Sequence, residues 1–428
     1  MGGRNIHPIK VFCLRHTCTH KTERLRVEVE RERLREQSCL MMIFSLQSLF
    51  VLCTFFYFGV LPKRQTRIYR RIGPFRTNGL AKDSSILHPL TPDARPSSSC
   101  QPVNNFVFVK THKTGSTTLR SITSRYGYTR DLSFLLSNDG RIGHFNGITL
   151  RYSSESSNFL PPLGVKKNDF PNYQNYNISN VHLKYNRRSL DKFMYRRHNL
   201  TLFTILRTPE EQWLSWFQYY KKYTKVGFKA DGISEAAMPY IERLEKENGD
   251  FNQQSRDLGI NDKKHFNDTL LRETVTEMTK DFNLVMITEY FDESLILLRK
   301  MMCWTFEDIL YVSKRKQPMK TQFPDDVKEK LYQYNHADVY IYEYFNRTLW
   351  RKIEEYGPSF KGELRYFRQL LTKKQNECIG QNSTTNGRRE FVEYHSLQNT
   401  SEFCELYVNE NFQLDSKIYR KQGGIGNM

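Results

Sequence analysis

The stretch that decides the fold reads Phe106-Val-Phe-Val-Lys110-Thr-His-Lys113-Thr-Gly115-Ser116-Thr117-Thr118-Leu119. Its four leading apolar residues predict a short buried strand, and the segment after Gly115 predicts a helix. The loop between them is rich in Lys and hydroxyl residues, and Gly115 lets the backbone approach a ligand closely. Backbone N–H groups at a helix N-terminus bind anions, and the macrodipole adds to the attraction. The stretch therefore predicts a phosphate-binding loop, although its spacing is not G-x-x-x-x-G-K-[ST]. A Thr/Ser-rich turn between a strand and a helix is the simpler alternative.

A second strand–turn–helix unit covers residues 200–220. Its strand, Leu200 to Leu206, is nearly continuous in apolar and β-branched residues, as in a buried parallel strand. Thr208 and Pro209 suit the N-cap and first position of a helix. Ligands of open α/β sheets bind at the strand edge where Arg207 falls, with Ser215 on the next helix. Alternatively, Arg207 pairs with a neighbouring glutamate, Glu210 or Glu211, and Ser215 is a serine that caps no helix.

A third unit begins with Asn283-Leu-Val-Met-Ile-Thr and continues into a helix with apolar residues at helical spacing. The acidic residues at its start, Glu289, Asp292 and Glu293, are interpreted as complementing the helix dipole. Three such units, the first with a phosphate loop, predict an α/β domain with a central parallel sheet flanked by helices.

The N-terminal part of the chain predicts a membrane anchor. Residues 40–61 form a run of 22 residues without a charge, long enough to cross a bilayer as a helix. The sequence predicts a cytoplasmic tail over 1–39, a signal-anchor span over 40–61, a stem over 62–101, a folded domain over 102–372 and an extension over 373–428. This topology is that of a single-pass type II membrane protein.

Glycosylation sequons and cysteines agree with this topology. The sequons all follow the predicted span, and their acceptors are Asn177, Asn199, Asn267, Asn346, Asn382 and Asn399. Four cysteines, Cys100, Cys303, Cys378 and Cys404, fall on the side where disulfides persist, and they allow three pairings. The predicted folded region lies in a lumenal compartment.

Several sequence blocks together resemble a known family. The Lys113–Leu119 loop resembles the 5′-phosphosulfate loop of sulfotransferases that use 3′-phosphoadenylyl sulfate (PAPS), and Arg207 with Ser215 resembles their 3′-phosphate pair. The finer resemblance is to the Golgi galactose 3-O-sulfotransferases, which include galactosylceramide sulfotransferase. It rests on five blocks in the family's order, which begin at Phe108, Val181, Glu289, Cys303 and Tyr344 and span residues 106–357. The C-terminal extension carries no block of the family that we identify.

The resemblance implies a P-loop-type sulfotransferase fold and an activity. Sulfuryl transfer from PAPS to the 3-hydroxyl of a terminal β-galactose on a glycolipid or glycoprotein glycan is expected, at the Golgi membrane with the catalytic domain lumenal. The implied donor-binding residues are Lys110, Lys113, Thr114, Gly115, Ser116, Thr117, Thr118, Arg207 and Ser215. Lys113 would also stabilise the departing phosphate, by analogy with phosphoryl transfer.

A sugar hydroxyl needs a general base, and histidine suits neutral pH. The resemblance implies His182 as this base, with His144 as the second candidate, whereas His112 is interpreted as shaping the loop. No ligand cluster in the folded region suggests a metal.

Other functions remain open at this stage. The net charge of +19 could suit nucleic acid, but a lumenal domain does not meet nucleic acid, and an anionic donor explains the charge. A uronic-acid 2-O-sulfotransferase of heparan or dermatan type is the close enzymatic alternative. A catalytically silent lumenal glycan-binding protein on the same fold is the alternative from another class. The acceptor, the disulfide pairing and the oligomeric state stay open.

Overall fold

The computed structural model describes residues 91–424, except 94, 98, 139–157, 170, 171, 174, 195–199, 248, 250, 261–267, 314–321, 387, 388, 409 and 410. The predicted tail, the predicted span over 40–61 and most of the predicted stem lie outside the described residues. Within the described part of the chain, no helix is both long and apolar enough to cross a membrane.

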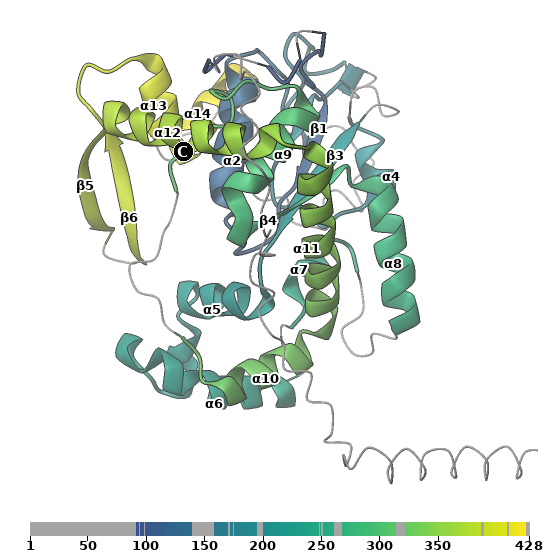
Figure 1. The fold of residues 1–428 in the computed structure, drawn as a ribbon, viewed down its shortest axis with the longest axis vertical. Helices are drawn as coiled ribbons and strands as arrows, with labels where there is room; N and C mark the ends of the chain where they lie inside the picture. The colour runs from purple at the N-terminus through teal and green to yellow at the C-terminus, as the bar shows by residue number, and fades with distance from the viewer. Residues whose placement is uncertain are drawn as a thin grey trace, which may run out of the picture. The chain divides into compact units, whose positions relative to one another are not determined.

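A four-stranded parallel sheet forms the centre of the described fold (Figure 1). Its strand order is β2-β1-β3-β4, with β1 at Phe106–Val109, β2 at Ile178–Ser179, β3 at Thr201–Leu206 and β4 at Leu284–Ile287. The register pairs Val109 with Thr204 and Leu206 with Ile287, so the strands end at one common edge. The three predicted strands and the parallel sheet are confirmed.

The direction in which strands are added to the sheet reverses at β1, and this reversal predicts the position of a ligand site. From β1 the chain passes to β2 on one side, then returns across β1 to β3 and β4 on the other side. In open α/β sheets, ligands bind beyond the carboxyl ends of the strands at such a reversal. The loops that follow β1 and β3 therefore flank the expected site.

Helices follow each of the three predicted strands. β1 leads into α2, Ser116–Tyr128; β3 leads into α5, Pro209–Tyr219; β4 leads through η6, Thr288–Tyr290, into α9, Phe291–Met302. The remaining described helices are α4 (Arg187–Leu190), η4 (Lys222–Val226), η5 (Ala230–Gly232), α6 (Ile233–Lys246), α7 (Gln253–Asp257), α8 (Asp268–Asp281), α10 (Asp325–Tyr334), α11 (His336–Tyr356), α12 (Ser359–Cys378), α13 (Glu402–Val408) and α14 (Asn411–Lys421). Pro209 occupies the start of α5 as predicted, but the Thr208 side chain does not cap that helix.

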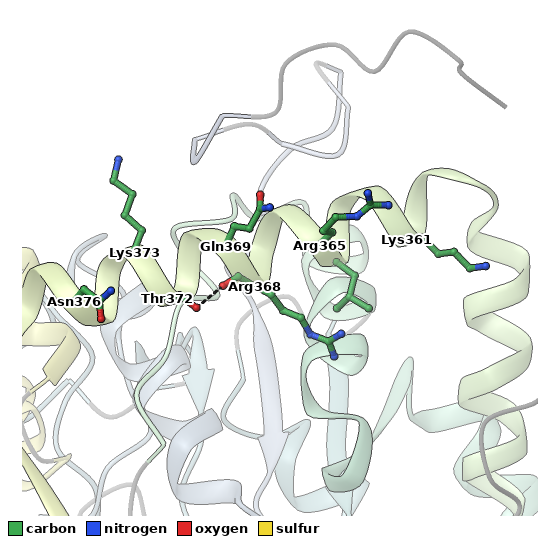
Figure 2. Close-up of a pocket in the computed structure, with 8 residues that line it drawn as sticks. Lys361, Arg365, Arg368, Gln369, Thr372, Lys373 and Asn376 are labelled. Atoms are coloured by element: carbon green, nitrogen blue, oxygen red, sulfur yellow. Dashed lines mark hydrogen bonds between the residues drawn. The ribbon is translucent and has the colours of Figure 1, made fainter. Parts of the chain in front are cut away.

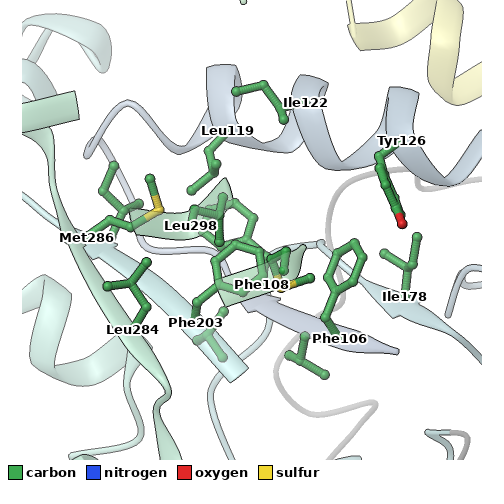
Figure 3. Close-up of a cluster of buried hydrophobic side chains, with 14 of the residues drawn as sticks. Phe106, Phe108, Leu119, Ile122, Tyr126, Ile178, Phe203, Leu284, Met286 and Leu298 are labelled. Atoms are coloured by element: carbon green, nitrogen blue, oxygen red, sulfur yellow. The ribbon is translucent and has the colours of Figure 1, made fainter. Parts of the chain in front are cut away.

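Aromatic and aliphatic side chains from the sheet and its helices fill the core (Figure 3). The rings of Phe108 on β1 and Phe203 on β3 stack with centroids 5.4 Å apart. Leu119 and Ile122 of α2 are fully buried beside them. Because α2 packs its apolar face on the sheet, its N-terminus is held at the strand edge where the phosphate loop ends.

A second, smaller cluster of buried side chains lies around α5. Trp213 stacks on Phe217 within α5, with ring centroids 4.8 Å apart. The ring centroid of Tyr240 on α6 lies 5.3 Å from that of Phe217. This packing fixes α5, so the start of α5 at Pro209 stays beside the end of β3.

Two disulfides and a hydrogen bond to the segment before β1 link distant parts of the domain. Cys100 pairs with Cys303, and Cys378 pairs with Cys404, which selects one of the three possible pairings. The last part of the predicted stem is attached rather than free, because the Pro92 carbonyl accepts a hydrogen bond of 3.0 Å from the Glu307 N–H. The folded unit therefore begins before the predicted boundary at residue 102.

The C-terminal segment is part of the same compact unit, which corrects the prediction of a separate extension from residue 373. That boundary falls inside α12, and β5 (Ile379–Asn386) and β6 (Arg389–Ser396) form an antiparallel hairpin after it. α14 packs on α2, where Asp415 pairs with the buried Arg120. The segment is polar in composition, which predicted loose attachment, but some of its side chains, including Tyr407 and Tyr419, are buried.

Candidate functional site

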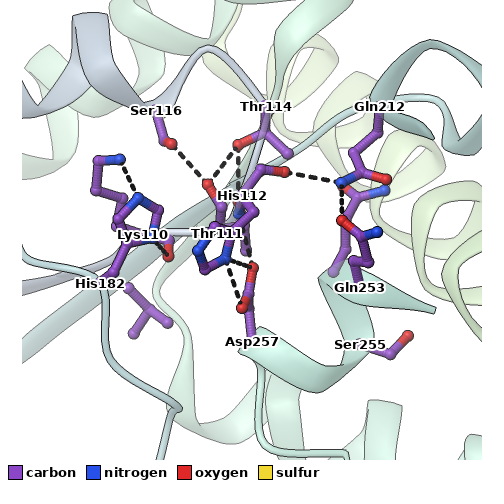
Figure 4. Close-up of polar contacts among 12 residues, drawn as sticks. Lys110, Thr111, His112, Thr114, Ser116, His182, Gln212, Gln253, Ser255 and Asp257 are labelled. Carbon is purple, nitrogen blue, oxygen red and sulfur yellow. Dashed lines mark hydrogen bonds and ion pairs between the residues drawn. The ribbon is translucent and has the colours of Figure 1, made fainter. Parts of the chain in front are cut away.

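The loop after β1 is shaped by its own hydroxyl groups (Figure 4). The buried Thr114 hydroxyl lies 2.8 Å from that of Thr111, and Ser116 Oγ donates to the Thr111 carbonyl at 2.6 Å. Gly115, at a φ of 72°, is the residue before α2. The Thr114 and Ser116 hydroxyls, which the family resemblance assigns to the donor phosphate, thus form hydrogen bonds within the loop; their contact with phosphate stays a prediction. Helix N-termini leave N–H groups without intrahelical partners, and this is the property for which the sequence predicts an anion site around Gly115 and the first turn of α2.

Two lysines of the loop have defined positions. Lys113, with a left-handed φ of 62°, places its ammonium 3.5 Å from the centroid of the Tyr219 ring of α5. The buried Lys110 places its Nζ 2.5 Å from Nε2 of His182. A cation over an aromatic face is stabilised by the ring quadrupole, so α5 orients one lysine while the segment after β2 holds the other.

Arg207 follows β3 and lies against the first loop, as the sheet topology predicts. Its Nη1 lies 3.5 Å from the Lys113 carbonyl, and its Nη2 donates to Glu211 at 2.9 Å. The predicted partner Ser215 lies on α5 and is half-buried. Arg207 therefore pairs with Glu211, as the simpler alternative expects, and its guanidinium also lies against the loop after β1; its role in binding phosphate stays a prediction.

The short helix α7 connects these loops, and sequence reasoning did not find it. Gln254 brackets the Arg207 backbone, accepting from its N–H at 2.8 Å and donating to its carbonyl at 2.9 Å. Gln253 bonds to Gln212 of α5 at 3.1 Å, and Asp257 bonds to His112. One helix of five residues therefore sets the position of both sheet-edge loops. The segment is polar and matches no motif, so no signal in the sequence marked it.

Two histidines, His112 and His182, meet in the described part of the site. His182 faces Lys110 with both ring nitrogens, Nδ1 at 3.2 Å from the carbonyl and Nε2 beside the ammonium. The ring of His112 stacks on that of His182, with centroids 4.0 Å apart and planes inclined by 19°. His144 lies outside the described residues.

The carboxylate of Glu289, which follows β4, also lies near the two loops. Glu289, on η6, accepts hydrogen bonds from the Thr208 N–H at 3.0 Å and from the Thr208 hydroxyl at 3.1 Å. Crowding by neighbouring residues raises the pKa of Glu289 through desolvation, even though Glu289 is exposed to solvent, and the hydrogen bonds from Thr208 oppose that rise. Asp292 and Glu293 instead pair with Arg368 of α12. Only the first of the three acidic residues therefore faces the candidate site.

Two of the hollows in the described part of the chain bear on the position of the site. One, of about 660 Å³, is lined by Tyr185, Gly259 and Asp281 among others, and it adjoins Asp257 through the chain. The other, of about 860 Å³, runs along the exposed basic face of α12 and contains Lys361 and Arg365 (Figure 2). The α12 hollow shares no residue with the loops of β1 and β3, so it does not define the site. Over the described part of the chain, no group of three or more metal-ligating side chains is found.

Together, these features define an α/β protein in which the loops that follow β1 and β3 meet at the strand edge of a parallel sheet. Comparison with known proteins gives the family: the profile of the galactose-3-O-sulfotransferase family matches residues 23–393. The chain therefore belongs to the galactose-3-O-sulfotransferase family.

Individual relatives agree with this assignment. The galactosylceramide sulfotransferase of Homo sapiens is 30% identical over 292 residues, or 65% of this chain and 65% of the human protein. The Mus musculus protein of the same name is 27% identical over 303 residues, 68% of this chain and 67% of that protein. Galactose-3-O-sulfotransferase 2 of Sus scrofa is 26% identical over 372 residues, 80% of this chain and 89% of that protein. The match thus spans about two thirds of the length of the first two relatives.

Proposed function

We propose that this chain is a carbohydrate sulfotransferase that transfers the sulfuryl group of PAPS to the 3-hydroxyl of a terminal β-galactose. The observation that carries the proposal is the contact of two loops that follow neighbouring parallel strands. The Arg207 guanidinium lies 3.5 Å from the Lys113 carbonyl, at the edge where such sheets bind nucleotides. Family membership supplies the reaction class.

The residues present suit a donor with two phosphate groups. The start of α2, with Gly115 in a left-handed conformation, offers backbone N–H groups to the 5′-phosphosulfate. Arg207, with Ser215, would hold the 3′-phosphate, because the guanidinium fork makes bidentate contacts with phosphate oxygens. Lys113 would stabilise the charge that develops on the departing 5′-phosphate. When bound, PAPS supplies the activated sulfuryl group.

The acceptor hydroxyl must lose a proton, and this end of the site holds two histidines. His182 is the base that the family resemblance implies, and it lies beside Lys110. The hollow next to Tyr185 and Asp281 lies close to His182 along the chain, and we propose that it admits the galactose-terminated glycolipid or glycan.

A Golgi membrane location with the described domain lumenal is also proposed. The two disulfides support an oxidising compartment. The predicted signal-anchor span over residues 40–61 would supply the attachment to the membrane.

A direct transfer assay tests the function. The full-length chain is incubated with ³⁵S-labelled PAPS and a panel of β-galactosides, galactosylceramide, heparan and dermatan precursors. Label at the 3-position of galactose is the expected result. Label on uronic acid would favour the 2-O-sulfotransferase alternative. Binding of the desulfated donor product without transfer to any acceptor would favour the silent glycan-binding protein.

A further inference from the structure

His112 is held by Asp257 in a way that sets the tautomer of its neutral ring (Figure 4). Its Nδ1 lies 2.9 Å and 2.8 Å from the two carboxylate oxygens, and its backbone N–H donates to Oδ2 at 2.7 Å. A nitrogen that faces a carboxylate carries the proton, so the neutral ring has its lone pair on Nε2. Among the residues that the structure describes, no hydrogen bond or ion pair reaches Nε2 of His112. The side chain is 36% exposed, and Nε2 is the ring nitrogen that Asp257 leaves available for a substrate.

His182 is in the opposite situation. Its Nδ1 faces the Lys110 carbonyl at 3.2 Å, and its Nε2 faces the Lys110 ammonium at 2.5 Å. A proton taken up at Nε2 would displace the lysine and leave two cations in contact, which electrostatics disfavours. In this arrangement His182 is a poor proton acceptor, whereas it is well placed to hold Lys110.

The surroundings keep His112 in one orientation. The His182 ring stacks on the His112 ring with centroids 4.0 Å apart. The His112 carbonyl accepts a hydrogen bond of 3.0 Å from Gln212. Asp257 belongs to α7, the helix that also brackets Arg207. His112 is therefore a fixed imidazole within the loop that runs from Lys110 to Lys113.

We propose that His112, oriented by Asp257, is the general base of the transfer, and that His182 is a positioning residue that stacks on it and holds Lys110. This inference rests on the proposed function. The acceptor hydroxyl gives its proton to Nε2 of His112 while its oxygen forms the new bond to sulfur. The bond between sulfur and the 5′-phosphate oxygen breaks, and its electron pair leaves with the phosphate beside Lys113. Asp257 stays ionised and stabilises the imidazolium, the arrangement known from Asp–His pairs in hydrolases.

The test compares His112→Asn, His182→Asn and Asp257→Asn in the full-length chain purified in detergent, with His395→Asn on the exposed part of β6 as the matched control. Transfer is measured at saturating PAPS, and binding of adenosine 3′,5′-bisphosphate by calorimetry. We expect His112→Asn to lower kcat at least about 100-fold, the scale of a lost general base, with the Kd changed less than about twofold. Asp257→Asn keeps an acceptor for the His112 N–H, and it should lower kcat with little change in the KM for PAPS. His395→Asn should match the unmodified chain.

A second readout does not depend on turnover. Diethyl pyrocarbonate acylates neutral imidazoles with an accessible lone pair, so mass spectrometry should find His112 modified before His182. If His112→Asn retains kcat within about threefold, less than the about 100-fold expected for a base, the inference fails. It also fails if that variant loses nucleotide binding in parallel with activity, or if His182 is modified first. An inactive unmodified chain that still shows selective labelling of His112 would count against the proposed function and not against the His112 geometry.

Discussion

The carboxylate of Asp338 on α11 accepts two hydrogen bonds from Ser255 on α7, one of 2.7 Å from the backbone N–H and one of 2.6 Å from Oγ. Its other oxygen accepts from the Gln254 N–H at 3.1 Å. Asp338 is fully buried, so these bonds replace the water that the carboxylate loses. Since α7 carries Gln254 and Asp257, the anchor in α11 determines where Arg207 and His112 lie.

This anchor predicts a pH dependence of stability. Burial raises the pKa of Asp338 from 3.8 to about 6, against the opposing effect of the bonds from Ser255 and Gln254. The folded protein therefore binds a proton that the unfolded chain releases between about pH 4 and pH 6. The contribution of this group to stability is present below about pH 4 and is lost as the pH rises to about 6, by about 3 kcal/mol at most.

The measurement is thermal unfolding of the unmodified chain and of Asp338→Asn between pH 4 and pH 7. The variant turns an amide N–H₂ toward a backbone N–H donor, which should cost about 1–3 kcal/mol. Its deficit in melting temperature should be largest near pH 4 and shrink toward pH 7. Asp326→Asn, in the exposed first turn of α10, controls for the loss of a carboxylate. A deficit that is the same at every pH would contradict the raised pKa of Asp338.

Glu211 pairs with Arg207 at 2.9 Å, and both side chains are partly exposed. We therefore expect Glu211 to compete with a phosphate group for the guanidinium. Glu211→Gln frees the guanidinium, and removing an exposed ion pair worth up to about 1 kcal/mol should tighten nucleotide binding by up to about fivefold. Arg207→Ala should weaken binding of adenosine 3′,5′-bisphosphate at least about tenfold, since hydrogen bonds to charged groups contribute about 1.5–3 kcal/mol. Calorimetry measures both, with Arg347→Ala on the exposed face of α11 as the control. Equal affinities of the unmodified chain and Arg207→Ala would remove Arg207 from the donor site.

The sequence predicted the parts of the site that lie on strand ends. Buried parallel strands are recognisable from short apolar runs, and parallel strands end at one edge of a sheet. Lys113 and Arg207 could therefore be expected together, although 94 residues separate them. The starts of two helices, after Gly115 and at Pro209, could also be predicted, because they depend on the local sequence alone.

The remaining contacts depend on packing between distant segments. Asp257 lies 145 residues from His112, in a polar stretch without periodicity, so nothing local linked the two. The interpretation of His112 as a loop-shaping residue is consistent with its backbone bond to Asp257, but it missed the carboxylate on the ring. The disulfide pairing was also beyond the sequence, because it depends on which of four cysteines approach within 6 Å between Cα atoms, as Cys100 and Cys303 do at 5.9 Å.

Lys113→Ala should lower kcat more than it weakens donor binding. The Lys113 ammonium now lies over Tyr219, and we expect it to turn toward the departing phosphate, where charge develops only during transfer. Loss of one such stabilising group costs about 100-fold to 1000-fold in kcat. Transfer at saturating PAPS measures kcat, and Lys361→Ala on the exposed face of α12 is the matched control. A raised KM with an unchanged kcat would instead mean that Lys113 only binds the donor in its ground state.

The described sequons differ in their access to a glycosyltransferase, and this difference predicts which asparagine is modified. Asn399 is exposed at a turn with a φ of 54°. Asn346 lies within α11 with its Oδ1 buried, and the Asn177 amide bonds to Asn105 at 2.9 Å and to the Ser133 N–H at 3.0 Å. We expect a glycan on Asn399 and none on Asn346 or Asn177.

Deglycosylation of the secretory-pathway product in ¹⁸O water, followed by peptide mass spectrometry, reads each of these sites. Asn399→Asp is the matched variant, because Asp also tolerates the left-handed backbone. It leaves in place Ser401, whose hydroxyl accepts a hydrogen bond from the Cys404 N–H. The variant should lose one glycan while keeping its melting temperature. A glycan on Asn346 would mean that this asparagine is modified before α11 folds and packs. An unmodified Asn399 would count against a lumenal location of the described domain.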